Sequence, residues 1–134
     1  FEKMNMKFDD EFNGKPLIET LLEPTNIYVK TFKALKDEIV AMAHITGGGI
    51  VENLPRVLPE NLMAEVQKDA IKVLPIFELM SEHIDRDEMF RAFNMGVGMI
   101  FVVEDANVEK VLATADGSYL IGEIKEGPRE AKLI

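Results

Sequence analysis

The chain contains no cysteine, so disulfide bonds, thiol catalysis and thiolate metal sites are excluded within these residues. Basic residues are in deficit, with 15 Lys and Arg against 24 Asp and Glu, and the formal net charge is −9. Nucleic acids and anionic membranes are bound through clustered Lys and Arg, so we expect neither as a partner. No apolar run approaches the roughly 20 residues that a membrane-spanning helix needs. The two histidines, His44 and His83, lie far apart without ligand spacing around them, and we predict no metal site.

What is present is an ordinary globular composition of 134 residues, 47% hydrophobic and 29% charged. A single domain of this length can bury about two-thirds of the surface of its unfolded chain. The sequence begins at Phe1, has its first Met at position 4 and opens with an acidic stretch. We interpret it as a piece of a longer protein, in which residues 1–24 form an arm that packs against a missing part. Residues 25–134 would then form the domain, and we expect a cytoplasmic location.

Apolar periodicity and turn residues divide the chain into alternating strands and helices. We predict a strand-prone run at 27–29, a helix from Thr31, a strand at 40–45, a short helix at 49–53, a strand at 62–67, helices from Pro75 and over 85–93, a strand at 97–103, a helix from Asp105 that stops at Gly117, and a strand at 118–124 before a polar tail. This order predicts the α/β (α+β) class, with a ferredoxin-like mixed sheet of about four main strands and packed helices.

Local signals set the expected helix ends. Thr31 and Asp105 are predicted N-caps, because their side-chain oxygens can accept from unpaired amides of a first turn. Leu54 precedes Pro55, which disfavours the α region at Leu54 and predicts that the short helix ends at Asn53. His83 shares the apolar face of the helix from Pro75, so we place it in the core or at its rim.

The strongest local signal is His44-Ile45-Thr46-Gly47-Gly48-Gly49. A strand that runs through three glycines into a helix can gather backbone N–H groups around an anion, and such a site needs no side-chain charge. We therefore predict that Gly47, Gly48 and Gly49 bind a phosphate group. A tight structural turn explains the same glycines equally well. His44 is a candidate proton donor beside that site, although a lone histidine at a strand end is more often structural.

Two further segments carry candidate site residues. The loop after the glycines holds Asn53 and, between two prolines, Arg56, whose guanidinium suits a bidentate contact to phosphate or carboxylate. The alternative for Arg56 is a surface ion pair with a neighbouring glutamate. The second segment, residues 90–99, contains Asn94, which can both donate to and accept from an amide or a heterocycle, and two glycines that permit close approach.

Four segments in this order resemble one family: Leu22-Glu23-Pro24-Thr25, His44-Ile45-Thr46-Gly47-Gly48-Gly49, Glu52-Asn53-Leu54-Pro55-Arg56-Val57-Leu58-Pro59 and Phe93-Asn94-Met95-Gly96-Val97-Gly98-Met99. The family is phosphoribosylformylglycinamidine cyclo-ligase, or aminoimidazole ribonucleotide synthetase, and the resemblance is to its carboxy-terminal domain. It covers residues 1–127, nearly the whole chain. One departure is Asn26, where the family commonly carries Arg.

The resemblance implies an ATP-dependent ring closure of formylglycinamidine ribonucleotide in purine biosynthesis. ATP phosphorylates the formyl oxygen, a nitrogen of the amidine closes the ring, and aminoimidazole ribonucleotide, ADP and phosphate are released. It also implies a homodimer, and a missing amino-terminal half that holds ATP and Mg²⁺. By motif position, His44 and Asn94 are catalytic candidates, and Gly47, Gly48, Gly49, Asn53 and Arg56 are phosphate- or substrate-binding candidates. A fragment without the other half is expected to be inactive by itself.

Two other interpretations remain open. One is a related ATP-using enzyme, such as selenophosphate synthetase, thiamine-monophosphate kinase or the hydrogenase maturation factor, which resembles this family in fold. The other is a non-catalytic module for ligand binding or dimerisation that keeps the same scaffold.

Overall fold

The computed structural model describes residues 4–134. Two short strands and a helix form the amino-terminal arm: β1 (Glu11–Phe12), β2 (Lys15–Pro16) and α1 (Leu17–Leu21). The remaining elements are α2 (Val29–Leu35), β3 (Ile39–His44), α3 (Gly49–Asn53), η2 (Leu54–Val57), β4 (Leu62–Val66), η3 (Lys68–Ala70), α4 (Pro75–Ser81), α5 (Arg86–Ala92), β5 (Met99–Val103), η4 (Asp105–Asn107), α6 (Val108–Thr114), β6 (Gly122–Glu126) and β7 (Ala131–Leu133). The predicted mixed α/β class is confirmed.

The four main strands that the sequence predicts are β3, β4, β5 and β6, and their hydrogen bonds divide them between two sheets. Strands β3 and β5 pair antiparallel, with Met42 opposite Phe101 and an irregularity between Ile39 and Ala41. In the other sheet β4 is central, antiparallel to β6 and parallel to β7. The pattern of apolar residues sets which face of a strand is buried, but it does not set the pairing partner, so this division was not predicted.

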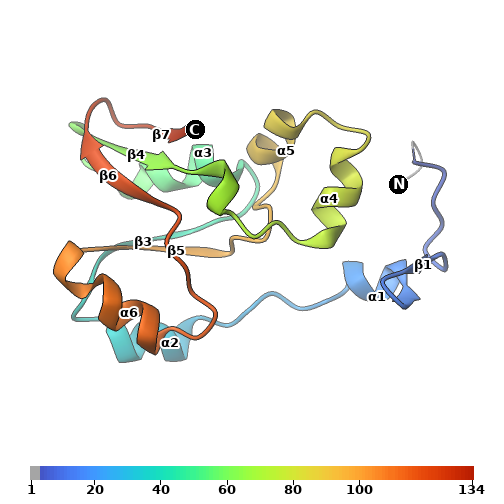
Figure 1. Ribbon diagram of the computed structural model, residues 1–134, viewed down its shortest axis with the longest axis horizontal. Coiled ribbons are helices and arrows are strands. Elements are labelled where there is room, and N and C mark those ends of the chain that lie inside the picture. Colours follow the sequence, from blue (N-terminus) through green and yellow to red (C-terminus); the bar gives the residue numbers. More distant parts are fainter. Residues whose placement is uncertain (1–3) are drawn as a thin grey trace.

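The two faces of the β3–β5 pair carry separate hydrophobic clusters. On one face Ala43 and Ile100 join the main core, which also contains α3, α5 and the three-stranded sheet. On the other face, near Ile39 and Val103, a smaller cluster holds Leu35 of α2 with Val111 of α6 and Ala115, which directly follows α6. Figure 1 shows β3 and β5 between these layers, with α2 and α6 side by side below them and α3 and β4 above. The pair therefore forms the middle layer of the domain.

The structure corrects the predictions around α2. Residues 27–29 do not form a strand, since Val29 already begins the helix, and Tyr28 rather than Thr31 is at the N-cap position, without a side-chain cap bond. Ile39, which directly precedes the predicted strand at 40–45, is the first residue of β3. The β-branched run is overridden because Leu35 is fully buried only when this segment packs as a helix against α6.

The short helix α3 ends at Asn53 as predicted, but the following proline is not the cause. Leu54 has helical angles, φ −65° and ψ −41°, although Pro55 follows it. The chain continues directly into the 3₁₀ turn η2, in whose first turn Pro55 is tolerated because no amide hydrogen is needed there.

Corrections also fall on the carboxy-terminal third. The last predicted strand begins at Gly122 rather than at residue 118, and the tail predicted as polar loop contains β7, whose Ala131 is buried against the core. Asp105 lies in the turn η4, and Asn107 occupies the N-cap position of α6 without a side-chain bond. Strand β7 was not evident in the sequence, because a strand of three residues is too short to show an alternating pattern.

Other local predictions are confirmed. Helix α4 begins at Pro75, and α5 begins after Asp85, whose Oδ1 accepts from the amides of Asp87 at 3.0 Å and Glu88 at 3.2 Å.

His83 is exposed, so it does not belong to the core. Figure 1 shows α1 and β1 standing apart from the body at the end of an extended segment. The role of the arm as a connection stays a prediction, and residues 1–3 lie outside the described part.

The Asp85 cap gives a direct test of this assignment. Replacing Asp85 by alanine is expected to lower the free energy of unfolding by about 1 kcal/mol, because two first-turn amides of α5 lose their acceptor. Asp105→Ala is the matched control, since the Asp105 side chain makes no cap bond to α6 or η4. Urea denaturation of both variants measures the difference. Equal destabilisation by the two substitutions would contradict the assignment.

Candidate functional site

The glycine segment forms a closed turn between β3 and α3. The amide of Gly49 donates to the carbonyl oxygen of Thr46 at 3.0 Å, and the amide of Glu52 donates to Gly48 O at 3.2 Å. Gly48 and Gly49 both have positive φ, 94° and 60°, which other L-residues adopt at a cost. One of the three glycine amides expected to face a phosphate is therefore used inside the turn.

Asn53 holds this turn from within the protein. Its side chain is buried, and its Nδ2 donates to Gly49 O at 2.7 Å and to Gly47 O at 3.2 Å. The hydroxyl of Thr46 lies 3.5 Å from Asn53 Oδ1 on the other side of the amide. Because both amide protons of Asn53 are engaged with the backbone of the turn, this residue fixes the shape of the glycine segment.

Gly49 also lies in tight contact with α5. A Cβ placed on Gly49 would lie 2.1 Å from Phe90 O and 2.9 Å from Phe93 O, both backbone atoms. The absence of a side chain therefore lets α3 pack directly on the carboxyl end of α5. This glycine is explained by packing, independently of any ligand.

The outer side of the turn carries one carboxylate and one guanidinium. In the described part of the chain, the amides of Gly47 and Gly48 have no acceptor within the protein. A Cβ placed on Gly48 would lie 2.4 Å from Glu52 Oε2, so this carboxylate is close to the turn. Arg56 Nη2 lies 3.9 Å from the same oxygen, and both side chains are mostly exposed. Such an exposed pair contributes little stability, and Arg56 can rotate toward an anion.

The segment from Asn94 to Gly98 lies beside the glycine turn. Asn94 Oδ1 accepts from the amide of Gly96 at 3.0 Å, and Met95 is fully buried with φ 54°. The amide of Ile45 donates to Gly98 O at 2.9 Å. Together with the contact of Gly49 on Phe90 and Phe93, this bond brings two of the sequence motifs into one region.

His44 is the last residue of β3 and pairs with Met99 of β5. Its side chain is exposed, so it is accessible to a ligand or another part of a larger protein. The structure thus places His44, Gly47–Gly49, Asn53, Arg56 and Asn94 around the β3–α3 connection and its contacts with α5 and β5.

The family model described as "AIR synthase related protein, C-terminal domain" matches residues 2–133. The chain belongs to this family. It is 47% identical over 129 residues to the phosphoribosylformylglycinamidine cyclo-ligase of Streptococcus sanguinis, covering 92% of this chain and 38% of that protein. The enzyme of the same name from Thermoanaerobacter sp. is 43% identical over 135 residues, covering 94% of this chain and 40% of the relative. The predicted resemblance is confirmed, and the chain spans about two-fifths of the length of these relatives.

Among solved structures, HypE of E. coli, a hydrogenase maturation protein, matches with a TM-score of 0.61 and 23% sequence identity. The match covers 87% of this chain and 40% of HypE. At this level of identity the likeness shows a shared fold. It supports the mixed α/β class of this AIR synthase related domain.

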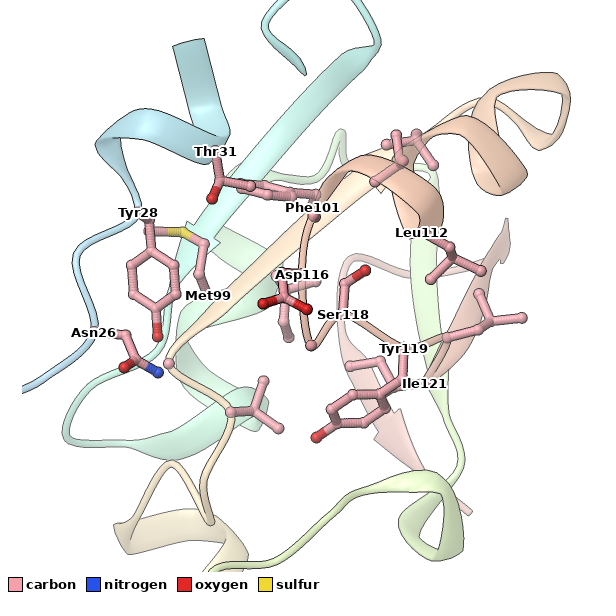
Figure 2. Close-up of a pocket in the computed structure, with 18 of the residues that line it drawn as sticks. Asn26, Tyr28, Thr31, Met99, Phe101, Leu112, Asp116, Ser118, Tyr119 and Ile121 are labelled. Carbon is pink, nitrogen blue, oxygen red and sulfur yellow. The ribbon is translucent and has the colours of Figure 1, made fainter. Parts of the chain in front are cut away.

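A cavity of about 310 Å³ is lined in part by Gly96 and Gly98, the two glycines that the sequence singled out for close approach. It is bounded by the segment Asn26–Thr31, strand β5, helix α6 and the loop after α6 (Figure 2). None of the seven predicted site residues lines it. Its lining residues come from three separated stretches of the chain, and Gly96, Val97, Gly98 and Met99 among them belong to the last of the four segments that carry the family resemblance.

Residues 4–134 contain no group of three or more His, Cys, Asp or Glu side chains placed to hold a metal ion. No helix among them is both long and apolar enough to cross a membrane.

Proposed function

We propose that this AIR synthase related domain is the carboxy-terminal part of a phosphoribosylformylglycinamidine cyclo-ligase. Such an enzyme converts formylglycinamidine ribonucleotide to aminoimidazole ribonucleotide with hydrolysis of ATP to ADP and phosphate, a step of de novo purine biosynthesis. The observation that carries the proposal is the identity of 43–47% to proteins of that name over more than nine-tenths of this chain. The family match over residues 2–133 includes the complete glycine turn and its surroundings.

Within this proposal the β3–α3 connection receives a phosphate group of the substrate or nucleotide. The amides of Gly47 and Gly48 would donate to its oxygens, and Arg56 would leave Glu52 to form a charge-assisted pair with it. Gly49 and Asn53 would act through the shape of the turn, since their hydrogen-bonding groups are engaged inside it. A phosphate must also displace the Glu52 carboxylate, which favours binding only when Arg56 compensates the negative charge.

His44 and Asn94 are proposed to orient the reacting groups, the formyl oxygen and the amidine nitrogen. His44 is exposed at the strand end and can donate a proton or a hydrogen bond. Asn94 Nδ2 makes no hydrogen bond within the described residues, while its Oδ1 accepts from the Gly96 amide, so the amide group is held in one orientation with its N–H groups available. These roles rest on accessibility and on position beside the turn.

ATP and Mg²⁺ are proposed to bind mainly to the rest of the longer protein, where Mg²⁺ would neutralise charge on the transferred phosphate. The segment between α1 and α2 exposes Leu22 at 73% and Ile27 at 84%, and Val29 at the start of α2 is 56% exposed. This apolar surface is suited to packing against that other part of the protein. We further propose a homodimer in the cytoplasm.

The test is a hybrid enzyme in which this chain replaces the corresponding two-fifths of the Streptococcus sanguinis relative. We expect ATP-dependent formation of aminoimidazole ribonucleotide by the hybrid and none by this chain alone. A folded hybrid that binds ATP but forms no cyclised product would contradict the proposal and would favour the non-catalytic module. In the same hybrid, Arg56→Ala is expected to raise KM for the ribonucleotide about tenfold, because a charge-assisted contact to phosphate is lost.

Arg129→Ala serves as the matched control for Arg56→Ala, since Arg129 is also exposed and lies outside the β3–α3 connection. Unchanged kinetics are expected for this control. An Arg56→Ala hybrid with wild-type KM would remove Arg56 from the phosphate site while leaving the family assignment intact.

A further inference from the structure

The hairpin of the amino-terminal arm turns through Asn13 and Gly14. Strands β1 and β2 pair antiparallel with Phe12 opposite Lys15, so these two residues alone form the loop. Both have positive φ, 54° at Asn13 and 80° at Gly14, which is the pattern of a type I′ turn. Asparagine and glycine are the residues that tolerate this backbone conformation best. The hairpin therefore explains why this pair of residues stands here.

The same pair is chemically unstable. The backbone nitrogen of the residue after an asparagine can attack the side-chain amide, and a large side chain on that next residue hinders the attack. Asn13 is followed by glycine, whereas every other asparagine of the chain is followed by Met, Ile, Leu or Val. Asparagine is a thermolabile residue in general, and Asn13 is the one with least hindrance.

The structure leaves this turn open to the reaction. Asn13 and Gly14 are both exposed, and a Cβ placed on Gly14 would meet no atom within 4 Å. Among the described residues, neither the Gly14 amide nor the Asn13 side chain has a hydrogen-bond partner. Asn53, by contrast, is buried and donates to two carbonyl oxygens. At Asn13 no hydrogen bond has to break before the two groups meet.

We propose that Asn13 is a site of spontaneous deamidation, and that its isoaspartate product opens the β1–β2 hairpin. The deprotonated Gly14 nitrogen bonds to Cγ of Asn13 and closes a five-membered succinimide ring, while the side-chain nitrogen leaves with the added proton as ammonia. Water then adds to one of the two ring carbonyls, which gives aspartate or isoaspartate. Water is the only co-reactant, and no atom is oxidised or reduced. The inference uses no residue of the β3–α3 connection and goes beyond the proposed function.

Isoaspartate changes the hairpin because it places an extra methylene group in the backbone of a two-residue loop. The pairing register, with Glu11 opposite Pro16, depends on the length of that loop. The hairpin also brings Asp10 next to the start of α1, where the Leu17 amide donates to Asp10 O at 2.9 Å and the Leu17 side chain is fully buried. Figure 1 shows β1 and α1 together in the arm, apart from the body of the domain. A change in the loop therefore acts first on the Leu17 hydrogen bond.

The reaction is tested on the full chain, incubated at about 37 °C and about pH 8 and then analysed by peptide mass spectrometry. We expect a mass gain of about 1 Da on the peptide that contains Asn13, at least about tenfold faster than on any other asparagine peptide. The rate should fall at about pH 6, because the attacking nitrogen must lose its proton.

Asn13→Gln is the matched control for the reaction. Gly14 is kept, but the longer side chain would have to close a six-membered ring, so we expect no mass gain on this peptide over the same period. Exposed Asn61 gives the internal comparison, because Leu62 follows it. An Asn13 peptide without a mass gain, or one that reacts no faster than the Asn61 peptide, would overturn the proposal.

Hydrogen exchange tests the opening of the hairpin. In the isoaspartate chain, separated by chromatography, the Leu17 amide is expected to exchange at least about tenfold faster than in the wild type, because its bond to Asp10 O is weakened. Asn13→Asp carries the same new charge on an unchanged backbone and should keep the wild-type exchange rate. Unchanged exchange in the isoaspartate chain, or an equal increase in Asn13→Asp, would contradict the proposal. None of these measurements involves ATP or phosphate, so their failure leaves the proposed function unaffected.

Discussion

Replacing Gly49 by alanine is expected to lower the free energy of unfolding by at least about 3 kcal/mol, a large part of the 5–15 kcal/mol typical of a domain. The new Cβ would lie 2.1 Å from the carbonyl oxygen of Phe90 and 2.9 Å from that of Phe93. Both are backbone atoms, so α3 and α5 must separate to make room. The positive φ of 60° adds a local strain of about 1 kcal/mol. Urea denaturation, or loss of soluble chain on expression, measures the effect.

Gly47→Ala is the matched control within the same three glycines. A Cβ on Gly47 meets no atom within 4 Å, and its φ lies outside the positive range. Its free energy of unfolding should therefore change by no more than about 0.5 kcal/mol. If both variants were equally stable, the close packing of α3 on α5 would be wrong. If both failed, the turn as a whole would be more constrained than the contacts indicate.

Replacing Asn53 by alanine is expected to cost about 2–3 kcal/mol of unfolding free energy. The Gly49 carbonyl loses a buried hydrogen bond at 2.7 Å and the Gly47 carbonyl one at 3.2 Å, and the site is too enclosed for free hydration. Asn53→Asp should be at least as damaging, because the carboxylate keeps the size but presents acceptors to two carbonyl oxygens. Denaturant midpoints for both variants give the comparison.

Asn61 supplies the control for Asn53. It is exposed, and its side chain makes no hydrogen bond within residues 4–134, so Asn61→Ala should change stability by less than about 0.5 kcal/mol. A stable Asn53→Ala variant with lower phosphate affinity would contradict a role in holding the turn. That result would favour direct contact of Asn53 with ligand, as the motif position alone suggested.

Much of the local structure could be predicted because short-range chemistry decides it. The start of α4 at Pro75 and the start of α5 after Asp85 depend on neighbours within four residues. The end of α3 at Asn53 was also predicted, but from an effect of Pro55 on Leu54 that the helical angles of Leu54 do not show. The predictions at residues 27–29 and at Thr31 failed where burial of Leu35 against α6 outweighs the intrinsic preference of the segment. Strand β7 was missed for a related reason, since its partner β4 is distant in the sequence and leaves no local pattern.

The candidate site, like the fold, could be predicted from the sequence only in part. The sequence indicated the glycine turn, Asn53, Arg56 and Asn94, and the order of its four motif segments was enough to identify the family. It could not distinguish the glycines by role. The structure does, because Gly49 contacts the backbone of α5 whereas Gly47 has open space. It also shows the Glu52 carboxylate close to the turn, and the negative charge of this carboxylate repels a bound phosphate.

By itself the sequence determined the family, the mixed α/β class and the acidic, cysteine-free chemistry of this domain, because residue types and their order along the chain specify these directly. Only the tertiary structure decided that Asn53 faces inward, that the main strands form two sheets, and that Asn26, Tyr28, Asp116 and Tyr119 surround one cavity. These features depend on residues distant in sequence being brought together by packing, and no local pattern carries that information.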